Sequence, residues 1–173
     1  HSIKNLEELQ RMMNIVVVGG GPTGVEVSGA LAEMKKYVLP KDFPELDFSK
    51  MNIYLLEGAD KTLAAMSEKS SQQSGKYLKR LGVTVMTNTL VKDYDGQNIM
   101  LQNGDQIPTS TVIRAAGIKG NVPAGIESSL IGKGNRIKTD RRCLVQGFNN
   151  IFAIGDLAYL ETPMFSTGFR QAA

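Results

Sequence analysis

The sequence predicts an α/β fold, a doubly wound parallel sheet with a three-stranded antiparallel β-meander as an additional layer. Short runs of β-branched residues alternate with segments of helical periodicity, which is typical of parallel strands joined by right-handed helical crossovers. The dipeptides Asp95-Gly96 and Asn103-Gly104 are strong hairpin signals and divide one region into short antiparallel strands. A length of 173 residues is enough for one domain with a substantial core.

The composition is that of a soluble globular chain, and it excludes several functional classes. Hydrophobic residues make up 42% of the chain and charged residues 21%, with a formal net charge of +3. We expect no nucleic-acid partner, because no basic run with interleaved aromatic residues is present. The single cysteine, Cys143, rules out an internal disulfide and a CxxC redox pair, and we interpret it as an ordinary thiol. No apolar run approaches the roughly 20 residues that cross a bilayer, and no metal-ligand cluster is predicted.

The first elements form a strand and a helix joined by glycines. Residues 3–13 have apolar residues at nearly helical spacing. Residues 14–18 are a β-branched run, as expected for a strand that is buried on both faces. A helix is expected over residues 22–37, with Pro22 in its first turn, where the missing N–H costs nothing.

The remaining elements are separated by proline and glycine signals. Pro40 and Pro44 cannot continue a helix, so we expect residues 38–50 to be an inserted surface loop. A helix over 67–81 is expected to be N-capped by Ser67 and to stop at Gly82. The predicted strands are 51–56, 83–86, the meander strands 89–94, 98–102 and a short piece near Ile107, the return strand 111–117, and 151–156.

A glycine-rich loop lies directly after the first strand and opens the helix, which is the context that a GxGxxG motif requires. Gly19 would make the tight turn, Gly21 would let a pyrophosphate approach the backbone, and Gly24 would let the helix pack on the strand. The helix N-terminus offers free N–H groups and positive potential to phosphates. We therefore predict a Rossmann-like dinucleotide site formed by Gly19, Gly20, Gly21, Pro22, Thr23 and Gly24. The alternative is a βα turn without a ligand.

Glu57 ends the second strand, where a carboxylate can accept hydrogen bonds from the adenosine ribose. The same carboxylate would repel a 2′-phosphate, which favours NAD(H) over NADP(H). Glu57 lies farther from the glycine motif than the usual spacing of about 20 residues, and the insertion at 38–50 accounts for the excess. Two alternatives remain open. Lys61 is near enough in the sequence to bind the 2′-phosphate of NADP(H), and Glu57 could face solvent without binding a ligand.

Two further acidic residues have more than one interpretation. Glu26 lies in the first turn of the predicted helix, where an acidic residue often only complements the helix dipole. The alternative is that Glu26 points toward the nicotinamide, which makes it the catalytic candidate. Gly155-Asp156 follows a predicted strand and, on local evidence alone, is a plain turn.

Five motifs together resemble the flavin-dependent pyridine nucleotide-disulfide oxidoreductases. The resemblance is strongest to the type II NADH:quinone oxidoreductases, which are single-subunit NADH dehydrogenases, and it covers residues 14–158. The motifs are VVVGGGPTGVEVSGALAE (16–33), IYLLEG (53–58), GVTV (82–85), TVIRAAGI (111–118) and NIFAIGDLA (150–158).

The resemblance implies that NADH reduces FAD by hydride transfer and that the electrons then pass to a quinone in the respiratory chain. It implies that Ala116 and Gly117 line NADH, that Glu26 lies near the junction of nicotinamide and flavin, and that Gly155 and Asp156 bind FAD. Two features depart from the family. Arg114 stands where a tryptophan is common, and the tail 162–173, with Gln171, resembles the quinone-site helix poorly.

The resemblance also predicts how the chain is organised. Residues 1–13 would be a linker helix from an FAD domain, residues 14–118 the NAD(H)-binding domain, and residues 119–173 a return segment and the start of the FAD-domain continuation. Such a chain would bind NADH and be inactive by itself, because only one glycine motif is present. The remaining flavin site would lie outside it.

The full-length protein is expected in the cytoplasm or peripherally on the cytoplasmic face of the inner membrane, through regions absent from this chain. A homodimer remains open. Two alternatives also remain open for the function. One is the NAD(P)H-binding domain of another flavin reductase, such as a ferredoxin or disulfide reductase, and the other is a non-catalytic nucleotide-sensing module.

Overall fold

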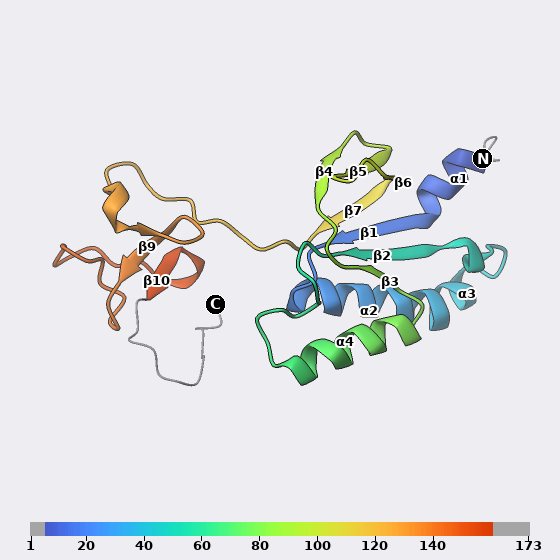
Figure 1. The fold of residues 1–173 in the computed structure, drawn as a ribbon, viewed down its shortest axis with the longest axis horizontal. Coiled ribbons are helices and arrows are strands. Elements are labelled where there is room, and N and C mark those ends of the chain that lie inside the picture. Colours follow the sequence, from blue (N-terminus) through green and yellow to red (C-terminus); the bar gives the residue numbers. More distant parts are fainter. Residues whose placement is uncertain (1–5, 161–173) are drawn as a thin grey trace. The chain divides into compact units, whose positions relative to one another are not determined.

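The computed structural model describes residues 6–160 (Figure 1). The chain forms two compact units, an N-terminal unit that ends at Gly117 and a C-terminal unit that begins at Ile118.

A four-stranded parallel sheet organises the N-terminal unit. Its strand order is β3-β2-β1-β7, and each pair of neighbours is parallel. Valine and isoleucine dominate β1, and Val16 and Val17 are fully buried, as expected for a strand covered on both faces. The strands are β1 (Asn14–Val18), β2 (Asn52–Leu56), β3 (Thr84–Met86) and β7 (Thr111–Arg114). The predicted α/β class is confirmed.

Helices α2 (Pro22–Tyr37) and α4 (Glu68–Arg80) cover one face of this sheet (Figure 1). The helices pack on Val17, Ile53 and Leu55, while Leu78 of α4 is completely buried. The bounds of α2 agree with the prediction. The Ser67 side chain accepts from the Ser70 N–H at the start of α4, and Gly82 follows its end with a φ of +86°. Helix α1 (Leu6–Met13) precedes β1 and buries none of its residues.

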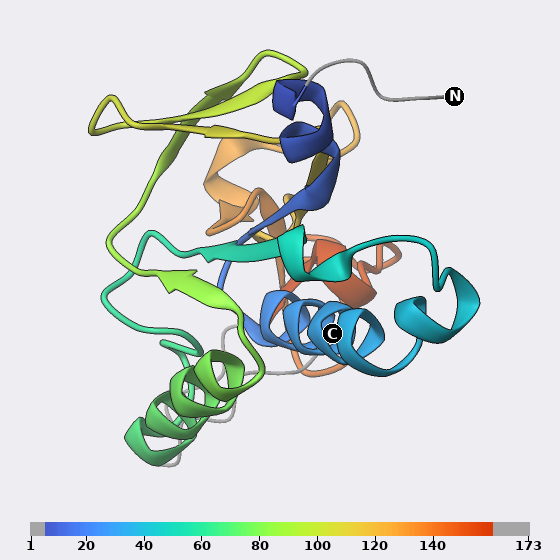
Figure 2. The same ribbon diagram turned by 90° about the vertical axis from the view of Figure 1, so that its right-hand side faces the viewer.

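The predicted meander is confirmed as a second, antiparallel sheet on the opposite face from α2 and α4 (Figure 2). Gly96 and Gly104 have positive φ angles in its two turns, as hairpin glycines should. Its strands are β4 (Val91–Tyr94), β5 (Asn98–Leu101) and β6 (Gln106–Pro108). Their buried residues Ile99, Leu101 and Ile107 pack against Val16 and Leu56 of the parallel sheet. The meander therefore completes the burial of β1.

A buried polar network joins the meander to the amino end of the parallel sheet. The Asn14 amide donates to the Pro108 carbonyl at 2.7 Å, and its Oδ1 accepts from the Asn52 amide at 2.9 Å. The Thr109 hydroxyl donates to the Asn14 carbonyl at 2.6 Å. Both Asn14 and Thr109 are at most 1% exposed, so these bonds replace water that the groups lose on folding.

Residues 38–50 are not the plain loop that their two prolines suggested. They contain a one-turn helix, α3 (Leu39–Asp42), and a 3₁₀ turn, η1 (Phe48–Lys50). Pro40 lies in the first turn of α3, where no intrahelical N–H bond is lost. The expectation was wrong because it treated the proline only as a helix stop.

The strand predicted over 151–156 is also wrong. Phe152 forms only an isolated bridge with Leu144, and the side chains of Phe152 and Ile154 are 61% and 73% exposed. Gly155 takes a φ of +62°, and the chain turns into the 3₁₀ helix η3 (Gly155–Leu157). An apolar run therefore did not mark a buried strand in this segment.

The C-terminal unit has its own small sheet and core. The sheet has the order β10-β9-β8, with β8 (Ile131–Gly132), β9 (Arg136–Thr139) and β10 (Ala158–Leu160), and the 3₁₀ helix η2 (Ser128–Leu130) precedes it. Ile137, Val145 and Ala153 form the buried centre. The tail 162–173 with Gln171, for which a quinone-site resemblance was considered, lies outside the described residues.

Candidate nucleotide-binding site

The glycine loop lies at the carboxyl end of the parallel sheet, between β2 and β7. The Gly19 N–H donates to the Leu56 carbonyl at 2.8 Å, which ties the loop to the end of β2. Gly19 has a φ of +112°, and a Cβ at this position would lie 2.6 Å from the Ala115 carbonyl oxygen and 2.7 Å from the Ala116 Cα. Only glycine fits here, because the backbone conformation and the space both exclude a side chain.

Gly24 sets how closely α2 approaches the loop. A Cβ on Gly24 would lie 1.7 Å from the Gly19 carbonyl oxygen and 3.5 Å from the Leu55 side chain. The absence of a side chain therefore lets the first turn of α2 sit directly on β1, β2 and the loop. This is the role that the sequence assigned to Gly24.

Gly21 differs from the other two motif glycines, because nothing in the fold requires it. Its φ of −72° and ψ of −175° are open to any residue. Among the described residues no atom lies within 4 Å of the position that a Cβ would occupy. Gly21 is also the N-cap of α2 and provides no side-chain cap. The space beside Gly21, at the start of α2, is therefore open.

Glu57 contacts the glycine loop through its carboxylate. Its Oε2 accepts from the Gly20 N–H at 2.5 Å, and its Oε1 accepts from the Ala59 N–H at 2.8 Å. A Cβ on Gly20 would lie 2.9 Å from the Glu57 side chain. Glu57 is half-buried and aimed at the loop rather than at bulk solvent. Each carboxylate oxygen still has a second lone pair with which it can accept a further hydrogen bond.

The loop that follows Glu57 folds over the glycine loop, and the sequence did not indicate this. The Leu63 N–H donates to the Gly20 carbonyl at 2.8 Å. Thr62 is 3% exposed, its hydroxyl lies 2.6 Å from the Ser74 hydroxyl, and its carbonyl accepts from the Ser71 hydroxyl at 2.6 Å. The spacing of Ser71 and Ser74 on one face of α4 was the signal that could have revealed this anchor.

Lys61 lies in this same loop and is paired with the first residue of α4. Its ammonium contacts the Glu68 carboxylate at 2.5 Å, and the two side chains are 37% and 61% exposed. The hydrogen bond that Lys61 donates to Glu68 raises the pKa of Lys61, and the same bond lowers the pKa of Glu68. Lys61 is thus held by an acidic residue outside the glycine motif.

The other predicted site residues are divided between the two units. Ala116 packs against Gly19, and Gly117 follows with a φ of +83° as the last residue of the N-terminal unit. Glu26 is exposed on α2 but lies just past its first turn, so the expected first-turn position is wrong. Gly155 and Asp156 belong to the C-terminal unit, where both are exposed on η3. The structure therefore brings the glycine loop, Glu57 and Ala116 together at one end of the sheet.

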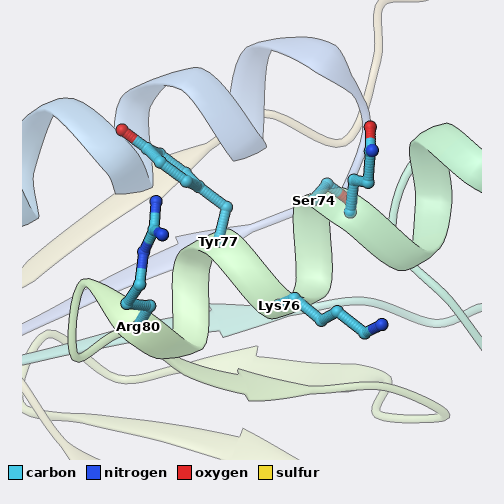
Figure 3. Close-up of a pocket in the computed structure, with 5 residues that line it drawn as sticks. Ser74, Lys76, Tyr77 and Arg80 are labelled. Carbon is cyan, nitrogen blue, oxygen red and sulfur yellow. The ribbon is translucent and has the colours of Figure 1, made fainter.

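A shallow depression on α4 is a separate feature. Its lining residues are Gln73, Ser74, Lys76, Tyr77 and Arg80 (Figure 3). The Tyr77 hydroxyl donates to Glu33 of α2 at 3.3 Å, and the Arg80 guanidinium lies 5.1 Å from the centre of the Tyr77 ring. None of the predicted site residues lines this depression, so the candidate site remains the carboxyl end of the sheet.

Residues 6–160 lack the features of two other classes of site. No group of three or more His, Cys, Asp or Glu side chains in that range could hold a metal ion. No helix in the same range has the length and apolar character to span a membrane.

Comparison with known proteins connects this geometry to a family. The chain is 31% identical to the type II NADH:quinone oxidoreductase Ndh of Mycobacterium tuberculosis, over 96% of this chain and 38% of the relative. It is also 31% identical to a probable NADH dehydrogenase of Dictyostelium discoideum, over 92% of this chain and 35% of the relative. The chain thus spans a little over a third of the length of these relatives.

Among solved structures, NDH2 of Plasmodium falciparum in complex with NADH matches with a TM-score of 0.75 and 24% identity, over 92% of this chain and 34% of that one. At this identity the match shows the fold. The model of the pyridine nucleotide-disulphide oxidoreductase family matches residues 1–173. The chain therefore belongs to the pyridine nucleotide-disulphide oxidoreductase family.

Proposed function

We propose that this chain binds NADH at the glycine loop and serves as the NADH-binding part of a flavoprotein NADH dehydrogenase. The pyrophosphate would lie against Gly19, Gly20 and Gly21 and the first turn of α2, which contains Pro22, Thr23 and Gly24. The open N–H groups and the positive end of the helix dipole supply the attraction. The names of the relatives support this assignment, since one is named a type II NADH:quinone oxidoreductase and another a probable NADH dehydrogenase.

The single observation that carries the proposal is the unexplained glycine at position 21. Gly19 and Gly24 are required by close contacts within the protein. Gly21 has ordinary backbone angles and open space beside it, so the fold would accept alanine there. A glycine that packing does not require is explained when a ligand must touch the backbone.

Glu57 would orient the adenosine ribose. Its oxygens already accept from Gly20 and Ala59 and can each accept once more. Hydrogen bonds from the ribose hydroxyls to this carboxylate would be charge-assisted. A 2′-phosphate at the same position would be repelled, so we propose NADH as the preferred nucleotide.

In the longer protein the reaction would be hydride transfer from NADH, with a quinone as the final acceptor. FAD, when bound, supplies the chemistry that takes up the hydride and passes two electrons to the quinone, which gains two protons. Gly155 and Asp156 would help to hold FAD. They fit this role because the Asp156 carboxylate is exposed. The positive φ of Gly155 directs the chain into the turn that contains Asp156.

Three residues would position the nicotinamide half of NADH. Ala116 and Gly117 follow β7 next to the glycine loop, which places their backbone beside the path of the dinucleotide. Glu26 is exposed near the start of α2 and would contact the nicotinamide end.

The longer protein would work at the cytoplasmic surface of the membrane, where a quinone is available.

Direct titration with NADH tests the binding proposal. In the 173-residue chain we expect Gly21→Ala to weaken NADH binding at least tenfold while the melting temperature stays unchanged. The matched control is Gly75→Ala in α4, where the described residues also leave the Cβ position free within 4 Å. That variant should bind NADH as the parent does. Equal NADH affinity of Gly21→Ala and the parent would contradict the proposal.

The electron acceptor is tested in the longer protein. We expect NADH oxidation that depends on FAD and on added quinone. Reduction of ferredoxin or of a disulfide, without quinone reduction, would favour another flavin reductase. NADH binding without any FAD-dependent activity would favour a nucleotide-sensing module.

A further inference from the structure

The loop after Glu57 contains a cation that the NADH site does not use. Lys61 lies between Ala59, whose N–H is bound by the Glu57 carboxylate, and Leu63, whose N–H is bound by the Gly20 carbonyl. Its backbone is therefore held beside the position where the adenosine ribose would lie. An ammonium near a ribose 2′ position is a feature that would attract a 2′-phosphate.

The ion pair with Glu68 holds the Lys61 ammonium away from that role. The ammonium contacts the Glu68 carboxylate, and the Gln72 amide also donates to Glu68, at 3.2 Å. Glu68 is the first residue of α4, so the helix fixes its position. The hydrogen bond with Glu68 is the largest cause of the raised pKa of Lys61, and the neighbouring Asp60 carboxylate raises it further.

The backbone on both sides of Lys61 would stay in place if Glu68 were removed. Thr62 is buried and bonded to Ser71 and Ser74 in the middle of α4, and none of these contacts involves Glu68. Loss of the Glu68 carboxylate would therefore free the Lys61 side chain without moving the loop. The freed ammonium would then be available to attract a 2′-phosphate, which would offset the repulsion of NADPH by Glu57.

We propose that Glu68 is a specificity-determining residue that favours NADH over NADPH by sequestering Lys61. This inference rests on the proposed nucleotide site and adds a second acidic residue to it. Glu57 acts on the ribose directly, whereas Glu68 acts through Lys61. The ion pair is solvent-exposed, and exposed pairs are weak, so the expected effect on affinity is modest.

The test compares NADH and NADPH affinities of the 173-residue chain at low ionic strength. Glu68→Ala should tighten NADPH binding about three- to fivefold, which corresponds to the strength of an exposed ion pair, and leave NADH binding unchanged. Alanine is chosen because a glutamine carbonyl could still accept from Lys61. The double variant Glu68→Ala with Lys61→Met should lose the gain.

Glu45→Ala is the matched control for net charge. Glu45 is an exposed acidic residue that precedes the amino end of β2. The proposed ribose site at Glu57 follows the carboxyl end of the same strand, so Glu45 changes the net charge without being part of the site. Its removal should change neither affinity. The gain in NADPH affinity caused by Glu68→Ala should also become smaller at high salt, because screening weakens the attraction between the Lys61 ammonium and the 2′-phosphate.

Two results would overturn the inference while leaving the proposed function intact. One is an unchanged ratio of NADPH to NADH affinity in Glu68→Ala, and the other is a gain that persists in the double variant with Lys61→Met. Failure of the proposed function has a different signature, since the parent chain would then bind neither nucleotide, and the specificity role would fall with it.

Discussion

The two ends of the parallel sheet keep their polar groups in opposite states. At the amino end, the Asn52 amide donates to the Asn14 side chain, the Asn14 amide donates to the Pro108 carbonyl of the meander, and the Thr109 hydroxyl donates to the Asn14 carbonyl. Asn14 and Thr109 are almost fully buried. At the carboxyl end, the described part of the chain leaves the space beside Gly21 open, and the N-terminus of α2 has no side-chain cap for N–H groups that lack an intrahelical partner. One end satisfies its groups internally, and the other leaves them for a ligand.

This difference separates stability from binding. Buried polar groups without partners cost free energy, so the amino end should be sensitive to any lost hydroxyl or amide. The carboxyl end can keep N–H groups open because solvent or a ligand reaches them. Substitutions at the two ends should therefore change different measurements, and the four predictions below run from the largest expected effect to the smallest.

Gly24→Ala should have the largest effect. The added Cβ would lie 1.7 Å from the Gly19 carbonyl oxygen, so α2 and the loop must move apart. We expect a loss of several kcal/mol of unfolding free energy, as for other overpacked sites, together with loss of NADH binding. Thermal unfolding and NADH titration measure both.

The matched control in the same helix is Gly29→Ala. Within the described part of the chain, the nearest atom to its Cβ would be a Leu81 methyl carbon at 4.0 Å. Alanine in a helix interior is favoured over glycine by up to about 1 kcal/mol. If Gly29→Ala destabilised the protein as much as Gly24→Ala, the close approach at the loop would not be the cause.

Thr109→Val should reduce stability without reducing nucleotide affinity. The hydroxyl donates to the Asn14 carbonyl and accepts from the Thr111 N–H at 3.1 Å, so its loss leaves buried groups unpaired. We expect a cost of about 1–3 kcal/mol, measured by denaturant unfolding. Ser110→Ala, at the exposed neighbouring position, should cost little. A weakened NADH affinity in folded Thr109→Val would show that the two ends are not separable.

Glu57→Gln should reduce nucleotide affinity and have a smaller effect on stability. Loss of the carboxylate removes charge-assisted hydrogen bonds to the ribose, so NADH binding should weaken by about 1–2 kcal/mol, while stability changes less. Isothermal titration with NADH and NADPH measures the effect. Tighter or equal binding of NADPH by the parent chain would contradict the role assigned to Glu57.

The smallest effect is expected at the exposed rim of the amino end. Asp95 accepts from the Asn98 and Gln97 N–H groups at 2.6 Å and 2.8 Å, and the Gln97 carbonyl accepts from the Thr109 N–H. The Asn98 N–H, followed by the Gln97 N–H, lowers the pKa of Asp95 below its ordinary value of 3.8.

Because the folded pKa is depressed, the stabilisation by Asp95 is present above pH 3.8 and is lost as pH falls through the lowered pKa. Amide exchange of Gln97 and Asn98 should therefore speed up, relative to the intrinsic rate, in this acid range. Asp95→Asn should remove this pH dependence. Its persistence in the variant would assign it to another carboxylate.

Local patterns predicted most of the N-terminal unit. The bounds of β1 and α2 follow from a β-branched run and a Pro-initiated helix, and the meander follows from two turn dipeptides. The strand expected over 151–156 failed because its apolar residues Phe152 and Ile154 are exposed in the structure. An apolar run indicates burial only where the chain has a layer to pack against, and sequence alone does not reveal that layer.

The sequence by itself therefore determined the fold class, the glycine loop and the acidic residue at the end of β2, because each depends on residues that are close together in the chain. Only the tertiary structure decided the rest. It showed that Gly19 and Gly24 are required by contacts while Gly21 is not, and that Glu57 bonds to the loop. It also showed that Lys61 is held by Glu68. Gly20 and Glu57 lie 37 positions apart and meet only when β1 and β2 pair in the sheet. Whether a side chain would fit at Gly19, Gly21 or Gly24 depends on what packs beside each position, which the local sequence does not specify.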